Sequence, residues 1–320
     1  MFYRGRRLRK NATIRNLIAE TKLHKEDFIF PIFVVEGNNI KNEISSLPNN
    51  YHWSVDRLHE VISEMNEVGV KACILFGIPE HKDCVGSEAY HDHGIVQEAI
   101  REIKRIDPSI YVIGDVCMCE YTDHGHCGIL DEFGDVKNDE TLTYLQKIVV
   151  SYAEAGIDMV APSDMMDGHI QALRSALDDA GYETLPIMGY SAKYASSYYG
   201  PFRAAANSAP SFGDRKAYQM DWHNGNEALR EIEADIYEGV DVIMVKPAMA
   251  YLDIIKEAKN NFNMPLCAYQ VSGEFAMLKM AVREGLMNEN VIEESLVAIK
   301  RAGADLIITY FALEMARKMG

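Results

Sequence analysis

Residues 238–245 read Glu-Gly-Val-Asp-Val-Ile-Met-Val, and this stretch joins the end of a helical segment to a short apolar run. The same succession of helix end, glycine and apolar run occurs again at residues 155–160 and 302–308. A glycine just past a helix end adopts the left-handed capping conformation without a steric penalty. Apolar runs without alternation are typical of strands buried on both faces, as in a parallel sheet covered by helices. The repeated unit therefore predicts an α/β fold.

Eight such apolar segments have the length of a strand, and helical segments separate them. Eight strands predict a closed (β/α)8 TIM barrel. An open doubly wound sheet is the alternative, but no Gly-x-Gly-x-x-Gly motif follows the first strand. We therefore expect an N-terminal arm over residues 1–27 and a barrel over residues 28–320. The expected strands lie near residues 28–34, 72–77, 111–116, 158–162, 186–190, 242–246, 266–270 and 305–309.

The longest gap between expected strands exceeds the length that one helix needs. Residues 191–225 are rich in Ser, Ala, Gly and Tyr, and a helix is expected at residues 227–238. Long segments of this kind in a compact domain are often functional loops that close over a site. We expect a lid here that closes over an active site of the barrel.

The charge of the chain is unevenly distributed. Residues 1–27 hold eight basic and three acidic side chains, a net charge of +5, so the remainder of the −16 chain carries −21. Such an acidic body disfavours nucleic acid as a partner. The basic arm is expected to embrace an acidic surface, such as that of a neighbouring subunit. Ile14, Leu17 and Ile18 have helical spacing and predict a short docked helix within the arm.

The lengths of the apolar runs and the pattern of cysteines indicate where in the cell the protein is expected. No run approaches 18 uninterrupted apolar residues, so no membrane span is expected. The N-terminus lacks the apolar core of a signal peptide. The six cysteines form no regular disulfide framework, which favours a reducing, cytoplasmic setting.

Residues 114–128 carry the strongest chemical signal. They read Gly-Asp-Val-Cys-Met-Cys-Glu-Tyr-Thr-Asp-His-Gly-His-Cys-Gly and contain Cys117, Cys119 and Cys127 after an expected strand. Three thiolates leave a fourth tetrahedral position open, which is the pattern of a catalytic zinc site. Buried cysteines are often mere apolar side chains, but Cys127 lies in a polar, glycine-rich segment. His124 and His126 are expected to surround the site rather than to bind the metal.

Two lysines end expected strands, where barrel enzymes keep their catalytic groups. Lys193 and Lys246 would each be desolvated, and each ammonium would disfavour the charge of the other, so both pKa values should fall. A neutral amine can attack a ketone and form a Schiff base. A single lysine could simply extend to solvent at the barrel rim. Two lysines beside a thiolate cluster favour chemistry.

The lid contributes two arginines. Arg203 and Arg215, with Gln219 nearby, could bind a substrate carboxylate, because the guanidinium fork pairs with both carboxylate oxygens. Solvated loop arginines are the alternative, and the two lysines favour the binding interpretation.

Several longer stretches resemble the porphobilinogen synthase family, also called the 5-aminolevulinate dehydratases. The resemblance covers essentially the whole chain. It rests on Asp115-Val-Cys-Met-Cys-Glu-Tyr-Thr-Asp-His-Gly-His-Cys-Gly, Ala161-Pro-Ser-Asp-Met-Met-Asp-Gly, Met188-Gly-Tyr-Ser-Ala-Lys-Tyr-Ala-Ser, Tyr199-Gly-Pro-Phe-Arg, Met244-Val-Lys-Pro-Ala and Ala268-Tyr-Gln-Val-Ser-Gly-Glu.

The resemblance implies a barrel with an N-terminal arm, assembled into homo-octamers. It implies a lyase that condenses two molecules of 5-aminolevulinate into porphobilinogen, with loss of two waters, in tetrapyrrole (heme) biosynthesis. It further implies zinc as the catalytic metal, because members that do not use this zinc carry carboxylates in place of the three cysteines.

The resemblance also assigns roles to residues. Lys246 would hold the first substrate and Lys193 the second. Asp115 would be catalytic, lining the pocket with Ser163 and helping to handle protons or the substrate amine. Ser272 and Tyr310 would hold the carboxylate of the first substrate, and Tyr190 and Phe202 would pack around that substrate. The carboxylate of the second substrate would be held by Arg203, Arg215 and Gln219. Zinc would be bound by Cys117, Cys119 and Cys127, and an allosteric magnesium at a subunit interface by Glu231.

Two other hypotheses stay open from the sequence. A Schiff-base class I aldolase on the same barrel would need one lysine, and neither the second lysine nor the cysteines. A zinc-storing or regulatory protein would bind zinc without turnover, and then the lysines, the arginines, Ser272 and Tyr310 would have no function.

Overall fold

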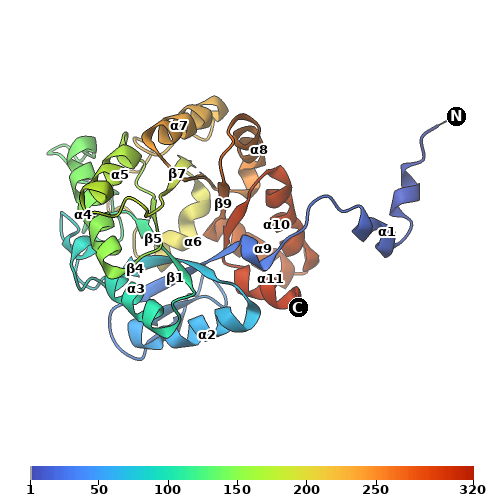
Figure 1. The fold of residues 1–320 in the computed structure, drawn as a ribbon, viewed down its shortest axis with the longest axis horizontal. Helices are drawn as coiled ribbons and strands as arrows, with labels where there is room; N and C mark the ends of the chain where they lie inside the picture. The colour runs from blue at the N-terminus through green and yellow to red at the C-terminus, as the bar shows by residue number, and fades with distance from the viewer. Residues whose placement is uncertain (1) are drawn as a thin grey trace.

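Eight strands form the barrel in the computed structural model, which describes residues 2–320 (Figure 1). Their order around the sheet is β6-β5-β4-β1-β10-β9-β8-β7, with parallel pairing throughout. A parallel bridge between Val160 and Ile187 joins β6 to β7 and closes the barrel. The predicted TIM barrel is confirmed. The strands are β1 (Phe28–Val35), β4 (Ala72–Ile78), β5 (Tyr111–Val116), β6 (Met159–Pro162), β7 (Met188–Lys193), β8 (Val242–Lys246), β9 (Leu266–Gln270) and β10 (Leu306–Thr309).

Helices surround the strands and bury their apolar stripes against them (Figure 1). Several end where the sequence predicts, because Gly69, Gly156 and Gly239 adopt positive φ angles of 84°, 93° and 100° at the helix ends. The outer helices are α2 (Leu58–Val68), α3 (Ile95–Ile106), α4 (Asn138–Ala155), α5 (His169–Asp179), α7 (Gly225–Glu238), α8 (Leu252–Asn261), α9 (Ser272–Arg283), α10 (Asn290–Ala302) and α11 (Ala312–Lys318).

The N-terminal arm leads away from the barrel and contains helix α1 (Ala12–Leu17) (Figure 1). The Asn11 side chain caps this helix by accepting a hydrogen bond from the Ile14 N–H at 3.0 Å. The expected short helix is therefore present. Its docking is not seen within one chain, because no residue of α1 is buried and Leu17 is 75% exposed.

The segment expected to be a lid contains more regular structure than its composition suggests. Strand β7 continues to Lys193, and helix α6 (Gly200–Ala205) follows a single 3-10 turn. Pro201 lies in the first turn of α6, where its missing N–H costs no hydrogen bond. The irregular part of the lid is thereby confined to the residues between α6 and α7.

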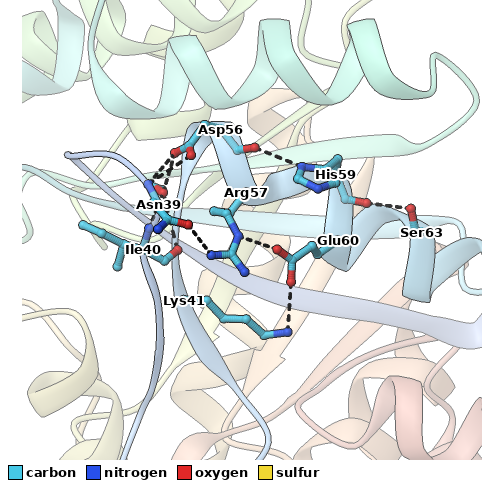
Figure 2. Close-up of polar contacts among 9 residues, drawn as sticks. Asn39, Ile40, Lys41, Asp56, Arg57, His59, Glu60 and Ser63 are labelled. Carbon is cyan, nitrogen blue, oxygen red and sulfur yellow. Dashed lines mark hydrogen bonds and ion pairs between the residues drawn. The ribbon is translucent and has the colours of Figure 1, made fainter.

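After β1, the strands β2 (Lys41–Glu43) and β3 (Tyr51–Ser54) pair to form a small antiparallel hairpin. Figure 2 shows the polar contacts that tie it to the start of α2. Glu60 accepts hydrogen bonds from Arg57 and from Lys41, the latter at 3.1 Å. Arg57 also donates to the Asn39 side chain at 2.6 Å. These side chains are partly exposed to solvent, so each pair adds little stability. Together they hold the hairpin in one orientation.

Within residues 2–320, no helix is both long and apolar enough to cross a membrane.

Candidate active site

The two lysines are neighbours at the carboxyl ends of adjacent strands. Lys193 ends β7, Lys246 ends β8, and the two residues are paired in the register of the parallel ladder. Both side chains are buried. The alternating geometry of strands points paired residues to the same face, so the sequence prediction that these amines share a site agrees with the fold.

Lys246 lies in an aromatic enclosure. Its Nζ is 4.5 Å from the ring centre of Tyr269 and 5.1 Å from those of Tyr190 and Tyr199. Phe202 lies at 5.3 Å. Burial, and next the charge of Lys193, lower the pKa of Lys246 to about 7. Near neutral pH this amine is therefore neutral in a large fraction of molecules and can act as a nucleophile.

This pKa predicts a pH dependence for the reaction of Lys246 with a ketone. A lysine of ordinary pKa, about 10.4, holds only roughly one neutral amine in two thousand at pH 7. We expect the rate of borohydride-trapped adduct formation at Lys246 to rise with pH up to about 7 to 8 and then to level off. A rate that continued to rise tenfold per pH unit to pH 10 would contradict the lowered pKa.

Lys193 differs from the expectation that both lysines would have lowered pKa values. Burial alone would lower its pKa, but the negative charge of the cysteine cluster, to which Cys127 contributes most, outweighs burial and raises it. Its Nζ donates a hydrogen bond to the Ser163 carbonyl. The prediction was wrong for Lys193 because it neglected these thiolates. A divalent cation on the sulfurs would oppose their attraction for the ammonium.

Asp115, two residues before Cys117, lines the same cavity as the two lysines. Its Oδ2 accepts a hydrogen bond from the Ser163 hydroxyl at 3.0 Å. Burial, and next the charge of Glu120, raise the pKa of Asp115 to about 7, while the two lysines oppose the rise. A carboxyl and an amine that both titrate near pH 7 can exchange roles as proton donor and acceptor, and they titrate as a pair.

The three cysteines form one buried cluster, as predicted. Their sulfur atoms all lie within 4.8 Å of one another, and the sulfurs of Cys117 and Cys119 are 3.3 Å apart. Three converging thiols are a donor set for a soft or borderline metal ion such as Zn²⁺. The cluster fits a metal of that class. It is the single group of three or more metal-ligating side chains found among residues 2–320.

The neighbouring histidine does not join the cluster. His126 uses both ring nitrogens elsewhere, with Nδ1 3.1 Å from the Tyr218 hydroxyl and Nε2 3.0 Å from the Phe212 carbonyl. Tyr218 in turn packs against the three cysteines. His126 therefore supports the wall of the cluster, in agreement with the sequence prediction.

A small cavity lies between the lysines and the cysteine cluster. Its volume of about 20 Å³ holds roughly one water molecule. The predicted residues that line it are Asp115, Cys119, Ser163, Lys193, Phe202, Arg203, Arg215, Gln219 and Lys246.

Several polar atoms on this cavity wall have no hydrogen-bond partner among residues 2–320. They include Nε of Arg203, Nε of Arg215, both amide atoms of Gln219 and Oδ1 of Asp115. Buried polar atoms are normally paired, so a group of unpaired ones marks a place that receives a polar ligand. Two guanidinium groups and an amide would suit a carboxylate.

Hydrogen bonds fasten the lid to the cysteine segment. Arg215 donates through Nη2 to the Gly125 carbonyl at 2.8 Å, and Ser211 donates through its backbone N–H to the His124 carbonyl at 2.9 Å. The His126 contact with Phe212 adds a third link. Lid closure and the shape of the cysteine segment therefore depend on each other.

The residues expected to bind the first carboxylate contact aromatic residues that enclose Lys246, namely Phe202 and Tyr269. Ser272 begins α9, and its hydroxyl accepts a hydrogen bond from the Phe202 N–H at 2.9 Å. The Tyr310 hydroxyl lies 3.0 Å from that of Tyr269. Both side chains are buried. They adjoin the cavity without lining its remaining space.

Glu231, on α7, does not line this cavity, but it lies near it because Gln219 lines both cavities. It lines a different cavity together with Asp167, and burial, with next the charge of Asp167, raises its pKa. A carboxylate made easier to protonate by nearby acids is stabilised when a cation binds between them.

Three residues of the site were not singled out from the sequence. Glu120 lines the cavity and lies 3.1 Å from the sulfur of Cys119. Tyr269 and Tyr199 enclose Lys246. The available signal for Glu120 was its place next to Cys119. No local pattern distinguishes these tyrosines from other buried aromatic residues.

Two buried lysines on adjacent strand ends, three converging cysteines and unpaired polar groups beside them are the features expected of a barrel enzyme that uses amine and metal chemistry. Comparison with known proteins narrows this class. The family profile described as delta-aminolevulinic acid dehydratase matches residues 2–318. The chain belongs to the delta-aminolevulinic acid dehydratase family.

Curated relatives carry the same description. The protein from Halalkalibacterium halodurans is 53% identical over 317 residues, covering 99% of this chain and 96% of its own. That from Bacillus subtilis is 52% identical over 317 residues, covering 99% and 98%.

A solved structure agrees with the fold in detail. Delta-aminolevulinic acid dehydratase (porphobilinogen synthase) from Toxoplasma gondii, in complex with its reaction product porphobilinogen, is 40% identical with a TM-score of 0.97, covering 99% of this chain and 92% of that one. An aldolase, QR15, reaches a TM-score of 0.50 at 12% identity, covering 93% and 96%, which shows a shared fold alone.

Proposed function

We propose that the chain condenses two molecules of 5-aminolevulinate into porphobilinogen, with loss of two waters, in tetrapyrrole (heme) biosynthesis. Membership of the family supports this activity. The observation that carries it is the pairing of Lys193 and Lys246 in register beside the three-cysteine cluster. An aldolase reaction would leave the second lysine and the cysteines without a function.

The two lysines would each hold one substrate. The neutral Lys246 amine attacks the ketone carbon of the first molecule, and loss of water gives a Schiff base. Lys193 does the same with the second molecule after it transfers a proton. An iminium withdraws electrons, so a C–H next to it becomes acidic, and the resulting enamine can attack the other substrate. Asp115, with a pKa of about 7, is suited to accept and return these protons.

Separate groups would orient the two carboxylates. Ser272 and Tyr310 would hold that of the first substrate, with Tyr190 and Phe202 packed around its chain. Arg203, Arg215 and Gln219 would hold that of the second. Two fixed carboxylates turn a reaction between identical molecules into an oriented one. The closed lid keeps water away from the imines, which hydrolyse readily.

Cys117, Cys119 and Cys127 would hold Zn²⁺, since three buried thiolates with room for a fourth ligand suit this ion. A zinc ion bound there would supply Lewis acidity next to the second substrate. The cavity wall beside the cluster, including Ser163 and Asp115, would keep the substrate in reach of that charge.

The test of this function is pyrrole formation from 5-aminolevulinate, measured with and without a zinc chelator. Product that disappears with chelator and returns with added zinc would support both the reaction and the cysteine site. Product formed after complete zinc removal would support the proposed reaction but exclude a role for zinc in it. The absence of product under both conditions would overturn the proposed function.

Glu231 is the proposed site of an activating Mg²⁺ ion. The half-buried carboxylate and neighbouring Asp167 could hold such an ion largely through water, which suits its reluctance to dehydrate. We expect Glu231→Gln to lose magnesium stimulation while its activity without magnesium stays within about twofold of the parent. Glu233→Gln, an exposed position on the same helix, is the control. Stimulation that persists in Glu231→Gln would remove Glu231 from this role.

The assembly and the location of the protein also remain proposals. The arm has an unpacked helix and a positive charge opposite to that of the body, which supports assembly into a homo-octamer through the arm. Removing residues 1–27 and measuring the mass of the protein in solution tests this assembly.

The three free, buried thiols of the cluster suit a reducing, cytoplasmic setting. Fractionation of cells tests this location.

A further inference from the structure

One fully buried carboxylate has no part in the chemistry above. Glu274 lies in the first turn of α9, with a side-chain exposure of 0%. A buried carboxylate is costly unless hydrogen bonds compensate it. Glu274 accepts hydrogen bonds from four backbone N–H groups, those of Val271 (2.9 Å), Met249 (2.7 Å), Ala248 (3.4 Å) and Ala250 (3.4 Å).

Three of these donors belong to the turn that follows Lys246. Ala248, Met249 and Ala250 are successive residues, and their N–H groups converge on the two oxygens of one side chain. Lys246 is separated from this turn by Pro247 alone. A side chain that fixes the turn therefore also fixes the end of β8, from which the Lys246 amine projects into the cavity.

The fourth donor belongs to the start of α9, directly after β9, the strand that pairs with β8. Val271 precedes Ser272, the residue whose hydroxyl is proposed to bind the first carboxylate. The same helix start touches the lid, because the Phe202 N–H donates to Ser272. A Cβ on Gly273 would lie 2.4 Å from the Tyr198 carbonyl oxygen, so the lid backbone packs directly against this turn.

We propose that Glu274 is a positioning residue that fixes the Lys246 turn relative to Ser272, and so sets the geometry of the first-substrate half of the site. The inference rests on the proposed function. Its basis is the bridge itself: one side chain holds the Lys246 turn and the start of α9 through backbone hydrogen bonds. A substrate that is anchored at its carboxylate and attacked at its ketone requires a fixed distance between these two segments.

The charge of Glu274 matters to this bridge. A carboxylate only accepts hydrogen bonds, whereas an amide would direct two donors at backbone N–H groups. Burial raises the pKa of Glu274 to about 7, and its backbone donors oppose the rise. The Glu274→Gln variant keeps the size of the side chain and removes part of its accepting capacity, while Glu274→Asp keeps the charge and shortens the reach.

The experiment traps 5-aminolevulinate with borohydride in the parent and in Glu274→Gln, and measures labelling rates at Lys246 and Lys193 by peptide mass spectrometry. We expect labelling of Lys246 to slow by about tenfold to a hundredfold relative to Lys193. The hydrogen bonds of Glu274 reach the turn after β8 and the start of α9, and none reaches β7. Lys193 in the same molecules is therefore an internal reference. Steady-state assays should show a higher KM as well as a lower kcat.

Glu293→Gln is the matched control, since it makes the same change at an exposed position in the first turn of α10. Its labelling ratio should equal that of the parent. Equal slowing at both lysines in Glu274→Gln, or slowing at neither, would overturn the inference. If Glu274→Gln does not fold, the labelling rates of Lys246 and Lys193 are compared in Glu274→Asp instead. A parent that labels neither lysine would overturn the proposed function, whereas a labelled parent with an unchanged variant ratio overturns this inference alone.

Discussion

The Lys246→Ala variant is expected to lose turnover by a factor of at least about 10³ while it folds like the parent. Removing a group that forms a covalent intermediate leaves only the catalysis supplied by binding and orientation. The fold should survive, because the Lys246 amine lies against aromatic rings and has a pKa of about 7, so no strong ion pair is lost. Turnover of 5-aminolevulinate and circular dichroism measure the two parts of this prediction.

Two further variants separate chemistry from packing. Lys246→Met fills nearly the same volume with an apolar chain, so it should be as inactive as Lys246→Ala but closer to the parent in thermal stability. Lys256→Ala removes an exposed lysine from α8 and should leave the activity unchanged. Activity of Lys246→Ala above a few per cent of the parent would refute the role assigned to this lysine.

The second large effect is expected for Cys119→Ala, which should lose zinc and activity together. Two thiolates remain after the substitution, and a tetrahedral zinc site that loses one of three protein ligands is greatly weakened. We expect the zinc affinity to fall by more than about a hundredfold, since changes outside the ligand set already cost tenfold to a hundredfold. Metal analysis of the purified protein and the pyrrole assay give the two readouts.

Cys84→Ala is the matched control for this change. Cys84 is a free cysteine that is exposed and lies outside the cluster, so its loss should alter neither zinc content nor activity. A Cys119→Ala protein that is free of zinc yet fully active would remove the metal from the mechanism. Equal losses in both variants would point to a general effect of thiol removal.

The barrel could be predicted from sequence because its signals are local. Most of the eight strands are short apolar runs, and the helices before several of them end at glycines such as Gly156 and Gly239. The least accurate prediction was that of β7, expected at residues 186–190 and found at Met188–Lys193. Its last four residues, Tyr-Ser-Ala-Lys, are not apolar enough to indicate a strand, although every one of them is buried in the barrel.

Barrel enzymes place their chemical groups at strand ends, so the positions of Lys246 and the cysteines followed from the strand assignment, and Lys193 lay three residues past the expected end of its strand. The environment of these groups could not be predicted. The raised pKa of Lys193 depends on sulfurs contributed by a different loop. The bridge made by Glu274 joins residues about 25 positions apart in the chain. The periodicity of apolar residues predicts helices and strands, but it does not predict such a long-range contact.

The bonds between the lid and the cysteine segment have an energetic consequence for the whole cycle. Arg215 and Ser211 hold the carbonyls of Gly125 and His124, so the two loops are ordered as one unit. A ligand that orders one loop lowers the entropic cost of ordering the other. If an ion on the sulfurs and a carboxylate at Arg215 both favour this joined arrangement of the loops, each would raise the affinity for the other by the same factor. Each ligand would then be an effector of the other.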